Sequence, residues 1–279
     1  MTPLRMAIEL ASPVQDKFAD FIAENRRANR PTRMVKPGTH VGRSAAICGA
    51  GPSLATADIR GVDEIFACNS ALPYLVARGI TVTAGVGVDQ TPGLLREWAD
   101  PPDVPYYVAS SCDPALIQHL RSHGRELRWF HNAVGIVGEH DRYCRTWPPG
   151  YIVGQGFTVV SRFIGLCEWM GFDRIDVYGA DCAFQGQDVA HANGEVATVA
   201  YHNPLIMTGR LPPSERDWYT RPDMLRDAVH LARRCRDAKG RLRLMGDTLP
   251  VALLGKDDAY LDQVSRTLAP GEIPPPPSH

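Results

Sequence analysis

The feature that most constrains the fold of this chain is an alternation of short apolar runs with helix-compatible stretches. Seven runs have the length and composition of buried β-strands, at 44–48, 64–68, 82–88, 106–109, 127–130, 174–178 and 242–245. Most of them are separated by predicted helices, at 71–78, 93–98, 114–123, 157–170 and 222–239. Strands that alternate with helices are typical of a sheet covered on both faces. We therefore predict an α/β fold with a doubly wound, mainly parallel (Rossmann-like) sheet.

Three further segments lie outside this alternation. An amphipathic helix is predicted at 13–29, and residues 183–220 are polar and longer than an ordinary connection, which predicts a lid. The sequence thus divides into an N-terminal helical arm (1–40), a nucleotide-binding catalytic domain (41–255, with the lid at 183–220) and a C-terminal helix with a proline-rich tail (256–279).

Composition limits the partners and the cellular compartment that we expect for the protein. The net charge of −1 gives no global attraction to nucleic acid or to an anionic membrane. No apolar run approaches the roughly 20 residues that a membrane span requires, and the N-terminus lacks a signal-peptide core. The 7 cysteines are scattered and never form a C-x-x-C pair, which predicts reduced thiols and a cytoplasmic protein. Two local basic clusters, at 26–36 and 233–243, leave a nucleic-acid acceptor open; a homo-oligomer is also left open.

The strongest motif is a glycine-rich turn directly after the first predicted strand. Its residues are Gly49, Ala50, Gly51, Pro52, Ser53 and Leu54. Two glycines permit a positive φ and close approach of a ligand to the backbone. Pro52 suits the first position of a helix, whose amides then face an anion. The turn is neither a dinucleotide fingerprint, since Leu54 replaces the third glycine, nor a P-loop. We expect it to bind a nucleotide phosphate; the alternative is a tight turn without a ligand.

Single polar residues follow the next two predicted strands. Asn69 follows the second and Asp89 the third. Ligands of open α/β sheets bind at the carboxyl ends of the strands. Asn69 is therefore a candidate to bind a base, a ribose or a phosphate, and Asp89 a candidate for a substrate or a metal ion. For each residue the alternative is a helix cap.

A second glycine turn, Gly154–Gly156, opens the predicted helix at 157–170, and the strand after that helix ends near Asp181. We expect Gly154, Gly156 and Asp181 to lie at the substrate, with Asp181 beside Asp89 if their strands are neighbours. The predicted lid holds His191, Tyr201 and His202. A histidine there can act as a general base near neutral pH.

These motifs, in this order, resemble the 6-hydroxymethylpterin diphosphokinase MptE-like family, which includes the motility-associated glycosyltransferases. They are also similar to bacterial lipooligosaccharide sialyltransferases, which carry a Gly-x-Gly-Pro-Ser-Leu loop for the CMP phosphate and a catalytic histidine in a mobile lid. The resemblance covers roughly residues 44–250. It implies a transferase that uses a nucleotide substrate.

The resemblance leaves two activities open. A diphosphokinase holds the ATP phosphates through Mg²⁺, which usually needs paired carboxylates. At the third strand the pterin enzymes carry a pattern similar to Asp-x-Asp, whereas this chain has the single acid Asp89. A CMP-linked sugar donor needs no metal ion. We therefore favour a glycosyltransferase with a nucleotide-sugar donor and a hydroxyl acceptor, with His202 or His191 as the base and Tyr201 beside it. In the diphosphokinase alternative, Asp89 and Asp181 would hold Mg²⁺. A third hypothesis is a non-enzymatic nucleotide-binding module whose arm docks a partner.

Overall fold

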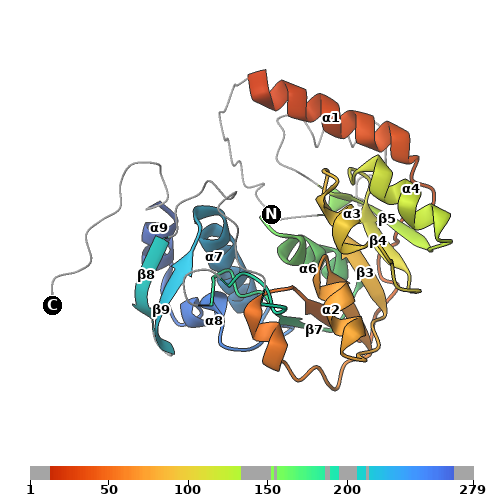
Figure 1. The fold of residues 1–279 in the computed structure, drawn as a ribbon. Coiled ribbons are helices and arrows are strands. Elements are labelled where there is room, and N and C mark those ends of the chain that lie inside the picture. Colours follow the sequence, from red (N-terminus) through yellow and green to blue (C-terminus); the bar gives the residue numbers. More distant parts are fainter. Residues whose placement is uncertain are drawn as a thin grey trace.

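The structure is a computed structural model that describes residues 13–132, 152–153, 156–185, 189–194, 206–211 and 214–266. Its centre is an eight-stranded sheet in which every pairing is parallel (Figure 1). The strands are β1 (Ser44–Cys48), β2 (Glu64–Cys68), β3 (Ala84–Gly87), β4 (Tyr106–Ala109), β5 (Leu127–Asn132), β6 (Ile152–Val153), β7 (Arg174–Tyr178) and β10 (Leu242–Leu244). The predicted sheet is confirmed; β6, a two-residue strand, is an addition to the prediction.

The predicted helices are present: those at 71–78, 93–98, 114–123 and 222–239 end one or two residues earlier, and the one at 157–170 begins two residues later, while α8 (Leu249–Leu253) is an addition to the prediction. They are α1 (Pro13–Asn29), η1 (Pro52–Thr56), α2 (Ala71–Ala77), α3 (Gly93–Glu97), α4 (Pro114–Ser122), α6 (Val159–Met170), α7 (Pro222–Asp237), α8 (Leu249–Leu253) and α9 (Asp258–Arg266). The element η1, which follows the glycine turn, is a short 3₁₀ helix with Pro52 in its first turn.

Helices cover both faces of the sheet. On one face, Phe163 of α6 packs against Phe66 of β2 with ring centroids 5.0 Å apart. Phe66 pairs with Ala84 of β3, and the next residue, Gly85, faces the opposite side because successive strand residues alternate. There a Cβ on Gly85 would lie 2.8 Å from a methyl group of Leu72 in α2. The sheet is therefore doubly wound, as predicted.

The strand order defines where a ligand can enter. It reads β10-β7-β1-β2-β3-β4-β5-β6. The chain runs outward from β1 to β6, and α6 then returns it to β7 on the other side of β1. The loops after β1 and β7 therefore leave the sheet in opposite directions. This switch point is where open α/β sheets form their ligand crevice.

Part of the predicted lid is a hairpin rather than a loop. β8 (Ile206–Leu211) pairs antiparallel with β9 (Ser214–Thr220). A bridge between Phe184 and Tyr219 ties β9 to the chain just after β7. Trp218 packs with apolar residues of α7, α8 and α9 in a second, smaller core.

Buried cysteines behave as the sequence predicts. The six cysteines in the described ranges are unpaired thiols. Burial raises the pKa of Cys48, at the end of β1, to about 12. A thiol with so high a pKa is a weak nucleophile, because the thiolate is the reactive form.

Helix α1 packs on the carboxyl edge of the sheet, next to α4 (Figure 1). Two buried asparagines one helical turn apart hold it there. The Nδ2 of Asn25 donates to the carbonyls of Gln90 and Ser111, both at 3.1 Å. The Nδ2 of Asn29 donates to the carbonyls of Ser110, at 3.0 Å, and Cys112, at 2.7 Å. The predicted N-terminal arm is thus joined to the domain through the loops that follow β3 and β4.

We predict that Asn29→Ala lowers the free energy of unfolding by roughly 2–4 kcal/mol, because it leaves two buried carbonyls without a donor. Denaturant unfolding would measure this change. Arg27→Ala is the matched control, since Arg27 is exposed on the same helix, and it should change stability by less than about 0.5 kcal/mol. Equal stability of the two variants would contradict the role of Asn29.

Candidate functional site

The turns that follow β1 and β7 meet in contact too close for any side chain. A Cβ on Gly49 would lie 2.5 Å from the carbonyl oxygen of Gly179, and a Cβ on Gly179 would lie 2.1 Å from that of Gly49. A Cβ on Gly51 would lie 2.2 Å from Oδ2 of Asp181. Neither glycine uses the positive φ that its residue type permits: the φ of Gly51 is −61°, and Gly49 is absent from the positive-φ residues. These glycines are needed because the protein's own β7 turn approaches them.

The amides of the glycine turn bond within the protein. The amide of Gly49 donates to the carbonyl of Tyr178 (2.8 Å), and that of Gly51 donates to Gly179 (2.9 Å). The amide of Leu54 donates back to the carbonyl of Gly51 (3.0 Å), and its side chain is buried in the core.

Asp181 occupies the position where the sequence predicts an incoming anion. Its Oδ2 accepts a hydrogen bond from the hydroxyl of Ser53 at 2.8 Å, and both carboxylate oxygens lie 3.2 Å from the Ser53 amide. The carboxylate is almost fully buried. A carboxylate thus lies where the sequence predicts a phosphate, and like charges repel each other.

A cavity of about 540 Å³ lies at the carboxyl edge of the sheet, around the switch point. That volume is typical of sites for small molecules and cofactors, which occupy roughly 300–1,000 Å³. Its wall includes most of the site residues that the sequence predicts within the described ranges: Gly49, Gly51, Asn69, Asp89, Asp181 and His191. Pro52 and Ser53 instead line a smaller neighbouring cavity.

Two arginines that the sequence analysis missed line the same cavity. Arg162 lies in the first turn of α6, and its Nε donates to the carbonyl of Gly156 at 3.2 Å. Arg221, directly before α7, pairs with Asp223 at 3.0 Å, with 13% of its side chain exposed. An arginine fork suits a phosphate group. Their local sequence gave no signal beyond proximity to a helix start, and only the fold brings them together.

The start of α6 also faces this cavity. Val159 and Val160 line it, and the amides of a first helical turn have no partner within their helix. Asp227 of α7 accepts from the amide of Phe157 (2.9 Å) and from the hydroxyl of Thr158 (2.6 Å), and so fixes where the helix begins. The start of α6 and the two arginines are the positively charged groups of a lining that also contains the carboxylates of Asp89, Glu97, Asp181 and Asp223.

Asn69 and Asp89 form a hydrogen-bonded pair in the lining of the same cavity. Asn69 has a φ of 48°, and its Nδ2 donates to Oδ2 of Asp89 at 2.9 Å. The Oδ1 of Asn69 is buried without a hydrogen-bond partner in the described part of the chain. Burial raises the pKa of Asp89, while the bond from Asn69 and the charge of Arg162 oppose that rise. Neither side chain caps a helix, since the caps of α2 and α3 are Ser70 and Pro92.

Asp89 and Asp181 do not lie on neighbouring strands, contrary to the conditional expectation. β3 and β7 are separated by β2 and β1, so the strands are about 14 Å apart at three strand spacings. The carboxylates themselves reach toward the two strands in between: that of Asp181 bonds to Ser53, after β1, and that of Asp89 bonds to Asn69, after β2. Among the residues that the structure describes, no group of three or more His, Cys, Asp or Glu could hold a metal ion.

Of the three predicted catalytic residues, the structure places His191 in the cavity wall. The amide of the next residue, Ala192, donates to the carbonyl of Ala50 at 2.8 Å and ties this segment to the glycine turn. Gly156 has a φ of 119°, and a Cβ there would lie 2.1 Å from the hydroxyl of Ser161. The backbone conformation and the packing against Ser161 therefore require a glycine at this position. Gly154, Tyr201 and His202 lie outside the described residues.

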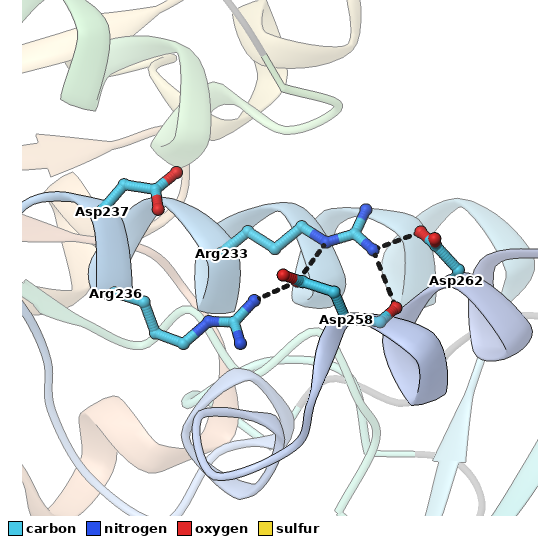
Figure 2. A pocket seen from close by; sticks show the side chains of 5 residues that line it. All are labelled: Arg233, Arg236, Asp237, Asp258 and Asp262. Carbon is cyan, nitrogen blue, oxygen red and sulfur yellow. Dashed lines mark hydrogen bonds and ion pairs between the residues drawn. The ribbon is translucent and has the colours of Figure 1, made fainter.

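Another cavity, of about 550 Å³, lies between α7 and α9, away from the sheet edge. Figure 2 shows its charged lining, in which Arg236 pairs with Asp258 at 2.6 Å and Arg233 pairs with Asp258 and Asp262. Exposed ion pairs of this kind contribute at most about 1 kcal/mol each. Its arginines and two of its carboxylates already pair with one another, and we assign no ligand to it.

Fold and site together define a doubly wound α/β protein with a ligand cavity at its switch point. The chain belongs to the 6-hydroxymethylpterin diphosphokinase MptE-like family, whose model matches residues 17–187. The resemblance is thus confirmed, and the match includes most of α1, which the motifs had left outside. No curated protein matches the chain. The relation to sialyltransferases stays a prediction.

Among solved structures, the chain is similar to the MAf glycosyltransferase from Magnetospirillum magneticum AMB-1. The TM-score is 0.55 at 14% sequence identity, and the alignment covers 89% of this chain and 42% of that one. The chain therefore spans less than half the length of that protein, and at this identity the likeness shows a shared fold. Within the described ranges, none of the helices has the length and apolar character to cross a bilayer.

We predict that Gly51→Ala lowers stability by about 1–3 kcal/mol, because its methyl group forces Asp181 and the β7 turn away. Gly93→Ala is the matched control, since a Cβ on Gly93 meets nothing within 4 Å. Thermal unfolding of both variants checks this. A Gly51→Ala protein as stable as the control would contradict the packing role of Gly51.

Proposed function

We propose that this protein is a glycosyltransferase that moves a sugar from a nucleotide donor to a hydroxyl group. The observation that carries the proposal is the cavity of about 540 Å³ that Arg162, Arg221, the start of α6 and the Asn69–Asp89 pair line together. The arginines and the helix start suit a phosphate, and the Asn69–Asp89 pair offers hydrogen bonds to a ribose or a base. The family and the shared fold with a glycosyltransferase support the same class.

In the proposed reaction, the acceptor oxygen attacks the anomeric carbon of the donor sugar. The bond from that carbon to the phosphate oxygen breaks, and its electron pair leaves with the nucleotide. Arg162, Arg221 and the amides of α6 stabilise the charge that grows on the departing phosphate. The proton of the acceptor passes to a histidine base, for which His191 and His202 are the candidates.

The alternative is a Mg-ATP-dependent diphosphokinase of the 6-hydroxymethylpterin type. The single acid after β3, Asp89, disfavours it, because a Mg²⁺ site for ATP phosphates usually uses paired carboxylates. A non-enzymatic nucleotide-binding module with a partner-docking arm is the third candidate. This third candidate is disfavoured because Asn25 and Asn29 of the arm are buried against the protein's own domain, where they bond to the chain that follows β4.

We expect CMP or another sugar-carrier nucleotide to raise the melting temperature without Mg²⁺, in a panel of CMP, CDP, UDP, GDP, ADP and ATP tested with and without the ion. A ligand at a hundredfold excess over its dissociation constant adds about 2.7 kcal/mol of stability. Arg162→Ala should weaken that nucleotide by roughly 10- to 100-fold, since it removes charged hydrogen bonds. Arg60→Ala is the control, because Arg60 is an exposed arginine paired with Asp58. Stabilisation by ATP that requires Mg²⁺ would instead favour the diphosphokinase.

We also expect one histidine variant to lose turnover. General-base catalysis typically contributes 10²- to 10⁴-fold, so His191→Ala or His202→Ala should slow nucleotide release from the donor by at least about 100-fold. His123→Ala is the control, since His123 is exposed at the end of α4. Unchanged turnover in both variants would refute the proposed base.

A further inference from the structure

A second, smaller cavity lies on the far side of Asp181 from the arginines. Its volume is about 230 Å³. The residues that line it come from η1, from the chain after β7 and from the loop after β10: Pro52, Ser53, Ala55, Thr56, Asp181, Ala183, Phe184, Gln185, Gly246 and Asp247. Asp181 and Ala183 also line the larger cavity, so the two spaces share a wall.

The two cavities differ in the basic residues of their lining. The larger one holds Arg162 and Arg221 beside the acidic residues Asp89, Glu97, Asp181 and Asp223. Among the described residues that line the smaller one, Asp181 and Asp247 are acidic and none is basic. A phosphate group in the smaller cavity would therefore lie close to like charges, which is unfavourable in a partly enclosed space.

The rest of the lining suits a hydroxylated molecule. Ser53, Thr56 and Gln185 offer hydroxyl and amide groups, and Phe184 adds an aromatic ring. The Ser53 hydroxyl already donates to Asp181 at 2.8 Å, so its oxygen can still accept a hydrogen bond. The volume is below the roughly 300–1,000 Å³ of pockets for drug-sized ligands, which suits a unit as small as one sugar ring.

We propose that this smaller cavity binds the acceptor, and that its two carboxylates select a neutral or amine-bearing sugar unit over a phosphorylated one. The inference rests on the proposed glycosyl transfer. It explains why the protein places Asp181 between the two spaces: the carboxylate keeps the nucleotide phosphate on the arginine side and accepts a hydrogen bond from the sugar on the other.

The test is saturation-transfer NMR with galactose, galactosamine and N-acetylglucosamine, beside galactose 6-phosphate, N-acetylglucosamine 6-phosphate and a serine- and threonine-containing peptide. Each is measured with and without the nucleotide that gives the largest thermal shift. We expect the unphosphorylated sugars to bind at least about fivefold more tightly than their phosphates. Equal or tighter binding of the phosphates, binding of the peptide alone, or no sugar binding would overturn the proposal.

Thr56→Trp locates the binding. Thr56 is exposed, lines only the smaller cavity, and its hydroxyl donates to the carbonyl three residues earlier. Thr39→Trp is the matched control, because Thr39 is exposed and makes the same kind of bond. We expect Thr56→Trp alone to weaken sugar binding by about tenfold or more, with the nucleotide thermal shift unchanged. Unchanged sugar binding in Thr56→Trp would refute the site, whereas a wild-type protein that binds sugar but no nucleotide would refute the proposed function instead.

Discussion

The contact between the turns after β1 and β7 is the constraint on which the rest of the structure depends. Gly49 and Gly179 approach so closely that neither position accepts a Cβ. This contact joins the two halves of the sheet at its switch point. It also carries Asp181 to Ser53, where amide and hydroxyl donors hold the carboxylate. The position of both cavities follows from this junction.

Asp181 divides the edge of the sheet by charge. A buried carboxylate is stable only where donors compensate for lost hydration, and Ser53 supplies them. The lining of the larger cavity also holds Arg162, in the first turn of α6, and Arg221, directly before α7. Asp227 of α7 fixes where α6 begins. Contacts far apart in the sequence thus arrange a phosphate-compatible wall on one side of Asp181 and an acidic one on the other.

Much of the architecture could be predicted because it depends on local pattern. Apolar runs predicted seven of the eight strands, and the two-residue β6 was too short to leave a periodic signal. Asn69, Asp89 and Asp181 could be named as site residues because the carboxyl ends of parallel strands share one edge. The order of the strands could not be predicted, since periodicity does not specify neighbours. That order places β1 and β2 between the strands that lead to Asp89 and Asp181.

The sequence by itself therefore determined most of the secondary structure, the parallel sheet and the edge that carries the candidate site, because residue spacing and turn chemistry act over a few residues. Only the tertiary structure shows why position 51 needs a glycine. A side chain there would collide with Oδ2 of Asp181, which is far away in the sequence. Only the tertiary structure places Arg162 and Arg221 in the lining of the larger cavity. In the sequence they are ordinary charged residues near helix starts. The charge around a residue, its burial and its packing depend on residues that are distant in the sequence, and only the folded chain brings those residues together.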